Sequence, residues 1–152
     1  MPKRARKNYI QQIKLASWNV RTLSDVTTSK RQAPERRTAL VAAELGRLDL
    51  DLACLSECCI PEEGEFIDGS YTFLHSGRSK DQPKQGVAIV LKTTLRPSVV
   101  SWKGINSRIM RMRIKLGKSC HATVISIYAP TFRRLIEERT AFHDQLSVLA
   151  SA

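Results

Sequence analysis

A short apolar segment that ends in a carboxylate dominates the first half of this sequence. Residues 51–57 read Asp-Leu-Ala-Cys-Leu-Ser-Glu, so the apolar run stops abruptly at Glu57. A continuous apolar run of this length is typical of a strand buried on both faces, between two layers of a fold. Glu57 would then stand where the core ends and a cleft can begin. That position suits a metal ligand or an acid–base residue, although a strand-end glutamate can also simply face water.

Length and hydropathy predict one globular domain. The chain has 152 residues, of which 42% are hydrophobic, enough for a single core. No apolar run approaches the ~20 residues that a membrane helix needs, so we expect no segment within a membrane. The basic start at residues 1–7 is not followed by the apolar region of a signal peptide. We therefore expect an intracellular protein, in the nucleus rather than the cytoplasm.

The charge is large and unevenly distributed. Of the net charge of +11, residues 1–47 carry +8, with residues 1–11 predicted to form a basic flexible arm. Such a distribution favours a polyanionic partner, with nucleic acid first and an anionic membrane surface second. A basic tail that only aids solubility or nuclear import is the alternative. Composition does not separate these interpretations.

The cysteines do not indicate a zinc site. Cys54, Cys58, Cys59 and Cys120 form no C-x-x-C pair, and no histidine stands beside them at zinc-finger spacing. We expect Cys54 to be a small buried hydrophobic residue, and the adjacent Cys58 and Cys59 to be free thiols in a loop.

Periodicity predicts a mixed sequence of strands and helices. We expect strands at 13–18, 51–57, 71–75, 86–91, 99–102, 108–114 and 121–127. Pro34 can open an amphipathic helix whose apolar face lies within 40–48, so the first two strands would form a crossover unit. Residues 61–69 suggest an acidic loop, and residues 76–85 a loop that closes a hairpin. A final amphipathic helix would carry Leu135, Phe142, Leu146 and Leu149 on its apolar face.

Five segments, in order, resemble the endonuclease/exonuclease/phosphatase family. They are similar above all to the endonuclease domains of non-LTR retrotransposons and to the craniofacial development protein 2-like proteins derived from them. The matching segments are Ser17-Trp18-Asn19-Val20-Arg21-Thr22-Leu23, Leu52-Ala53-Cys54-Leu55-Ser56-Glu57, Gly86-Val87-Ala88-Ile89-Val90-Leu91, Ser107-Arg108-Ile109, and Ile125-Ser126-Ile127-Tyr128-Ala129-Pro130-Thr131. Each segment alone is weakly specific, but together they cover nearly the whole chain beyond the basic arm.

The resemblance implies roles for four residues. Glu57 matches the glutamate that binds a divalent cation, Mg²⁺ or Mn²⁺, and one carboxylate is adequate when substrate completes the metal shell. Asn19 and Tyr128 match the catalytic asparagine and tyrosine that reach the scissile phosphate. Arg108 matches a strand arginine that could contact the DNA backbone. Without the resemblance, each could equally be a turn residue, a core edge or a solvated face.

The chain also departs from the family pattern. Members carry a second half after the tyrosine strand, with a Gly-Asp-Phe-Asn-like segment and a terminal Ser-Asp-His-like segment. After Tyr128 the only acids and histidine are Glu137, Glu138, His143 and Asp144, and none stands in such a segment. His75, His121 and His143 match no catalytic position, and we interpret them as structural or surface residues. The chain therefore resembles the N-terminal half of a nuclease.

The expected fold follows from this resemblance. Residues 12–152 would form a truncated α+β domain, half of a four-layer α/β/β/α sandwich with mostly antiparallel sheet and outer helices. The sheet face meant for the second half would then be exposed, and could support self-association.

The leading functional hypothesis is a Mg²⁺-dependent DNA endonuclease domain of retrotransposon type, inactive as this chain stands. A basic nucleic-acid-binding or interaction module without catalysis is the first alternative. A phosphatase acting on small phosphates is the second, since one fold can support several activities.

Overall fold

The computed structural model describes residues 12–24, 36–79 and 84–152. The predicted arm at residues 1–11 and the helix start predicted at Pro34 lie outside these residues. In chain order the elements are β1 (Leu15–Asn19), α1 (Arg37–Arg47), β2 (Leu52–Ser56), β3 (Glu63–Asp68), β4 (Tyr71–Ser76), β5 (Val87–Lys92), the 3₁₀ helix η1 (Thr93–Ser98), β6 (Val99–Asn106), β7 (Ile109–Lys115), β8 (His121–Ile127) and α2 (Ile136–Ala150).

Five strands form the first sheet, in the order β1-β2-β5-β4-β3. Strands β1 and β2 are parallel and are joined through α1, so the predicted crossover unit is confirmed. The other neighbours in this sheet are antiparallel, and β4 and β5 pair as the predicted hairpin. The fold is therefore α+β with mostly antiparallel sheet, as expected.

Strand β2 is buried on both faces, which confirms the prediction from residues 51–57. On one face Ala53 and Leu55 pack with Val41 and Leu45 of α1. On the other face Leu52 joins a second apolar cluster. Strand β5 likewise contributes residues to both clusters, because successive side chains of a strand point to opposite faces.

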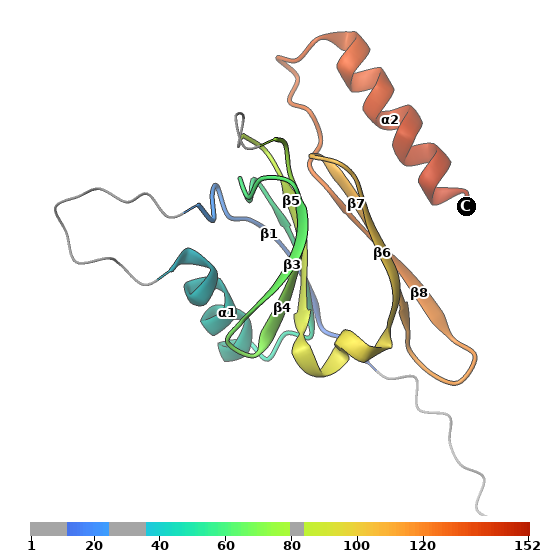
Figure 1. The fold of residues 1–152 in the computed structure, drawn as a ribbon. Helices are drawn as coiled ribbons and strands as arrows, with labels where there is room; N and C mark the ends of the chain where they lie inside the picture. Colours follow the sequence, from blue (N-terminus) through green and yellow to red (C-terminus); the bar gives the residue numbers. More distant parts are fainter. Residues whose placement is uncertain (1–11, 25–35, 80–83) are drawn as a thin grey trace, which may run out of the picture.

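The second apolar cluster lies between two sheets. The 3₁₀ helix η1 leads from β5 to a three-stranded antiparallel sheet, β6-β7-β8, whose Met110, Met112 and Ile114 pack against Leu74 and Ile89 of the first sheet. Figure 1 shows the resulting succession of layers, with α1 outside the five-stranded sheet and α2 beyond the three-stranded one. The expectation that the face of the first sheet is left exposed is therefore wrong, because the chain covers that face with its own second sheet.

The acidic segment at residues 61–69 is not a loop. Residues Glu63–Asp68 form β3, which pairs antiparallel with β4. Phe66 stacks on Phe73 of β4, with ring centroids 4.9 Å apart. Glu63 and Glu65 alternate with Gly64 and Phe66, so these two carboxylates lie on the water-exposed side of an edge strand, whereas Asp68 at the strand end is buried.

Helix α2 is attached to the sheets by few contacts. Phe142 is its single buried residue, Leu146 and Leu149 are half-buried on the same face, and the Asn106 amide donates to Gln145 Oε1 (2.9 Å). Leu135, predicted for the apolar face, is instead the exposed residue just before the helix. In the described part of the chain, neither this helix nor α1 combines the length and hydropathy that crossing a bilayer requires.

Candidate functional site

Parallel pairing of β1 and β2 brings Asn19 and Glu57 together. Asn19 is the last residue of β1 and pairs with Ser56, the last residue of β2, so Glu57 follows at the same edge of the sheet. The Asn19 Nδ2 donates to Glu57 Oε1 (2.9 Å), and Asn19 Oδ1 accepts from the backbone N–H of Arg21 (3.0 Å). Both ends of the Asn19 amide are therefore held by the structure around it.

The loops around this edge adopt unusual backbone conformations. Six non-glycine residues of the described chain have positive φ, and four of them border the site: Arg21 (62°), Glu57 (58°), Cys59 (55°) and Gln85 (81°). Each such residue costs about 1–3 kcal/mol and persists where surrounding contacts enforce it, and such residues cluster at functional sites.

Tyr128 and Arg108 complete the opposite wall of the site, from the three-stranded sheet. Tyr128 directly follows β8, and its backbone N–H donates to the carbonyl of Arg108 (2.8 Å). The Arg108 guanidinium lies over the Tyr128 ring, 4.9 Å from its centroid, and Nη1 donates to the Tyr128 carbonyl (3.0 Å). On its other side the Gln85 oxygen can accept from Arg108 Nη2 (3.1 Å). Arg108 thus positions Tyr128 as well as facing the cleft.

Neighbouring groups tune the two titratable side chains at the centre. The hydrogen bond from Asn19 lowers the pKa of Glu57 below its usual value, and the Tyr128 hydroxyl and Arg21 lower that pKa further. Burial, followed by the proximity of Glu57, raises the pKa of Tyr128. Around neutral pH the site therefore presents a carboxylate beside a protonated phenol, which is a cation ligand next to a hydrogen-bond donor.

Glu57, Arg108 and Tyr128 line a cleft of about 300 Å³. Its walls are formed by Glu57, Cys59, Lys84, Gln85, Arg108, Tyr128, Thr131 and Arg134. One carboxylate therefore faces three cationic side chains, an arrangement that suits a phosphate group bound together with a metal ion.

Lys84 and Arg134 line the cleft but were not predicted from the sequence. Both are exposed, and each lies next to a predicted element: Lys84 just before β5, and Arg134 six residues after Tyr128. Isolated basic residues in loops carry no pattern, so only the folded chain shows that they share a cleft with Glu57.

Among the described residues, Glu57 is the only carboxylate that lines the cleft. The lining contains neither histidine nor aspartate. His143 packs edge-on against Phe142 of α2, with ring centroids 5.3 Å apart, and His121 is exposed at the start of β8. His75 is buried in β4 beside Phe66. The described residues also contain no group of three or more His, Cys, Asp or Glu side chains able to hold a metal ion by themselves.

The architecture is that of the endonuclease/exonuclease/phosphatase-like fold, and this chain corresponds to the N-terminal half of that fold. Among solved structures, it is similar to the crystal structure of the AP endonuclease LMAP from Leishmania major. The TM-score is 0.60 and the sequence identity 13%, and the match covers 86% of this chain and 44% of the other.

A curated relative supports the same assignment. The chain is 25% identical over 117 residues to craniofacial development protein 2 of Bos taurus. The match covers 77% of this chain but 18% of that protein, so this chain spans less than a fifth of the relative's length. No protein-family model matches the chain.

Proposed function

We propose that this chain is the phosphate-binding half of a Mg²⁺-dependent DNA endonuclease of retrotransposon type, and that alone it binds DNA without cutting it. The observation that carries this proposal is one cleft lined by Glu57 and Tyr128, with Asn19 bonded to Glu57 beside it, whose remaining charged walls are cationic. A nuclear location fits a DNA substrate. The similarity to an AP endonuclease supports the reaction class.

The side chains have separate tasks in this proposal. Tyr128 donates a hydrogen bond to an oxygen of the bound phosphate, Asn19 holds Glu57 beside it, and Lys84 and Arg134 attract the neighbouring DNA backbone by charge. Arg108 keeps Tyr128 in position through its ring contact and its bond to the Tyr128 carbonyl.

The residues fit a Mg²⁺ or Mn²⁺ ion held jointly with substrate. Glu57 is ionised and offers one carboxylate, and Mg²⁺ commonly takes one or two carboxylates with waters and phosphate oxygens. When bound, the ion would supply charge stabilisation for the phosphate. With a single carboxylate, we expect affinity for the metal alone to be weak.

We expect no efficient hydrolysis by this chain, because the described residues of the cleft include no histidine and no second carboxylate to serve as a base for the attacking water. Loss of one positioned acid–base group costs on the order of 10²–10⁴ in rate. The alternative, a binding module without catalysis, therefore differs from the main proposal in one respect. In the main proposal a second half completes the catalytic site, and in the alternative it does not. A phosphatase acting on small phosphates is less favoured, because a net charge of +11 suits a polymer with many phosphates.

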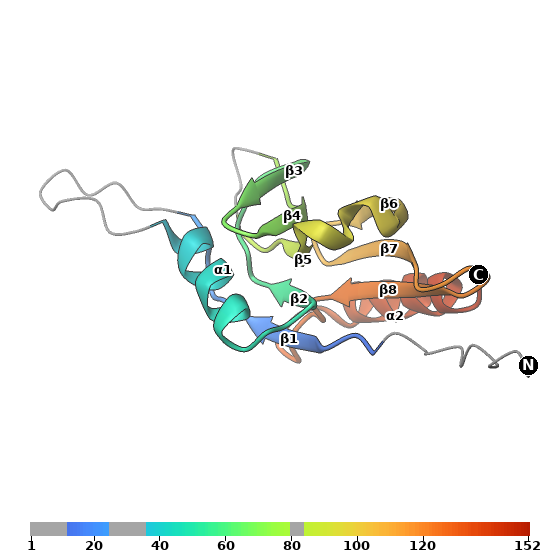
Figure 2. The ribbon, with the colours of Figure 1, turned by 90° about the horizontal axis from the view of Figure 1, so that it is seen from below.

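We further propose that the chain self-associates, through a surface other than the one first expected. Strands β1 and β8 are edge strands within the described part of the chain, and they lie on the same side of the sandwich (Figure 2). An apolar groove of about 390 Å³ separates them, lined among others by Leu15, Val124 and Ile127. A second copy related by a two-fold axis normal to the sheets would pair β1 with β1 and β8 with β8, extending both sheets at once.

Cys59 provides a direct test of phosphate binding in the cleft. In a Cys120→Ser background, alkylation of Cys59 is followed by mass spectrometry with and without a short DNA duplex at low salt. Because Cys59 lines the cleft, DNA should slow its alkylation. The double variant Lys84→Gln/Arg134→Gln should abolish this protection, whereas Lys14→Gln/Arg47→Gln, with the same loss of charge elsewhere, should retain it.

Two results would overturn the proposal. Either Cys59 reacts at the same rate with DNA present, or the Lys84/Arg134 variant is protected as fully as the control. Both would place DNA away from the cleft.

A further inference from the structure

Positive charge is concentrated in one continuous part of the chain that the candidate site does not account for. Residues 82–136 contain eleven Lys and Arg residues and no Asp or Glu, which equals the whole net charge of +11. This segment includes the entire three-stranded sheet. Lys84, Arg108 and Arg134 belong to the cleft, but a second group of basic residues lies on β6, β7 and the turn after β7.

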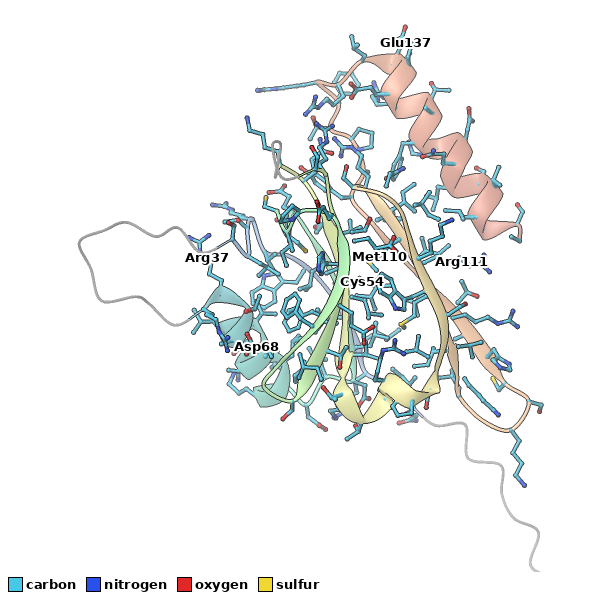
Figure 3. All side chains as sticks on the ribbon, in the orientation of Figure 1. Arg37, Cys54, Asp68, Met110, Arg111 and Glu137 are labelled. Atoms are coloured by element: carbon cyan, nitrogen blue, oxygen red, sulfur yellow. The ribbon has the colours of Figure 1, made fainter. Side chains whose placement is uncertain are left out.

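The strand pattern places this second group on the outer face of the three-stranded sheet. Met110, Met112 and Ile114 face the other sheet, so the alternate residues Arg111 and Arg113 face outward, and Lys115 with them. Figure 3 shows this alternation at β7: Met110 lies near Cys54 between the sheets, and Arg111 lies on the opposite side. Residues two apart on a strand are about 6.7 Å apart, roughly twice the 3.4 Å axial spacing of phosphates along one strand of DNA.

The neighbouring strand adds charge of the same sign. Lys103 of β6 pairs directly with Arg111 of β7, and Ser101 pairs with Arg113. Lys118 is exposed in the turn that joins β7 to β8. Like charges directly opposite on a sheet destabilise it, so this arrangement has an energetic cost in the isolated chain.

Several basic residues of the first sheet, helix α1 and η1 are paired with carboxylates. Lys14 and Lys92 bond to Asp49, Arg47 to Glu44, and Arg96 to Glu65. By contrast, Lys103, Arg111, Arg113, Lys115 and Lys118 make no ion pair or side-chain hydrogen bond with any described residue. The outer face of this sheet therefore carries a row of basic residues without a carboxylate partner among the described residues.

We propose that the outer face of β6–β7, from Lys103 to Lys118, is a second binding surface for the phosphate backbone of duplex DNA. No carboxylate of the described chain forms an ion pair with Lys103 or Arg111. A polyanion bound on this face would therefore offset the repulsion between these two residues. Helix α2 contacts the Asn106 end of the sheet and leaves Lys115 and Lys118, at the far end, exposed. The surface does not depend on the cleft, and the proposal stands whether or not the cleft binds phosphate.

The test is the salt dependence of duplex DNA binding. Each lost phosphate contact reduces the slope of log K against log salt concentration by about 0.9. For the whole chain, Arg113→Gln/Lys115→Gln should therefore reduce the slope by about 2. The control Lys14→Gln/Arg47→Gln removes the same charge from residues already paired with carboxylates and should leave the slope unchanged. Both Arg113 and Lys115 are exposed, so the variant should fold with an unchanged melting temperature.

The outcomes separate this surface from the cleft and from a membrane. Continued protection of Cys59 by DNA in the Arg113/Lys115 variant, with a reduced slope, supports two distinct surfaces. A reduced slope without any protection of Cys59 supports the outer face and defeats the proposed function. If the Arg113/Lys115 variant and the Lys14/Arg47 control show the same salt slope for DNA binding, the outer face is not a DNA-binding surface. If the Arg113/Lys115 variant keeps the wild-type DNA slope but loses binding to phosphatidylserine vesicles, the outer face binds a membrane surface instead, and the proposal is wrong.

Discussion

Asn19 lowers the pKa of Glu57 at the centre of the site. Its hydrogen bond is the largest cause of the lowered pKa of Glu57. Asn19→Ala should therefore raise the pKa of Glu57 toward its usual value, and Tyr128→Phe should raise it as well. Carboxyl NMR titration measures both. Glu65, held by Arg96, is the internal control and should not respond. A Glu57 pKa that is the same in Asn19→Ala would show that the amide does not hold the carboxylate.

His75 makes stability depend on pH in the mildly acidic range. Burial lowers the pKa of His75 in the folded chain below the ordinary histidine value of 6.5, and its Nδ1 has no hydrogen-bond partner among the described residues. The unfolded chain therefore binds more protons between the folded pKa and 6.5, so stability is full above this window and falls as pH falls through it. Chemical denaturation from pH 7.5 to 5 should show this loss. His75→Gln should make the free energy of unfolding nearly independent of pH in this window, whereas His121→Gln, at an exposed position, should keep the dependence. If the wild-type chain and both variants lose the same stability as pH falls, His75 is not the cause.

At the scale of the elements, α2 depends on one side chain. Phe142 is its only buried residue, 5% exposed, whereas Val148 is 71% exposed. Phe142→Ala should lower the local opening free energy of α2 by up to about 3 kcal/mol, the low end for loss of a buried phenylalanine, and leave both sheets intact. Hydrogen exchange should then speed up in α2 alone. Val148→Ala should leave exchange unchanged, and slow exchange in the Phe142 variant would show that other contacts hold the helix.

The elements that the sequence predicted well are those whose burial leaves a periodic pattern. Residues 51–57 and 86–91 are apolar on both faces because two layers cover them, and both became central strands. Strand β3 was missed because an edge strand needs few apolar residues, and Phe66 alone packs on Phe73. The second sheet was predicted as strands but not as a covering layer, since strand patterns do not specify which sheet a strand joins.

The site was predictable where a side chain borders a strand. Asn19 ends β1, Glu57 and Tyr128 directly follow β2 and β8, and the structure brings them together. Lys84 and Arg134 lie in loops, where nothing local distinguishes a cleft residue from a solvated one. The basic row on β7 was not predicted, because only the structure shows that Met110 and Met112 fill the inner face and leave Arg111 and Arg113 on the outer one.

At the scale of the whole molecule, the open side of the sandwich should drive association. Sedimentation equilibrium should detect a dimer, and Ile127→Lys should convert it to monomer by placing a charge in the groove between β1 and β8. Ile67→Lys is the matched control, because Ile67 is also an exposed apolar residue, but on the edge strand β3 at the other side of its sheet. A wild-type chain that is monomeric at all concentrations, or a dimer that survives Ile127→Lys, would contradict this interface.

The central proposal is a half-site that binds DNA phosphate but offers, among the described residues, no base for the attacking water. Its most direct test is nicking of supercoiled plasmid by the purified chain with Mg²⁺, over a range of enzyme concentrations. Glu57, Asn19 and Tyr128 can stabilise charge, but the described cleft offers no base for the water and no histidine. The predicted result is no nicking above background, with no difference between the wild-type chain and Glu57→Ala. Robust nicking that Glu57→Ala abolishes would contradict the account and would show that the chain completes its own active site.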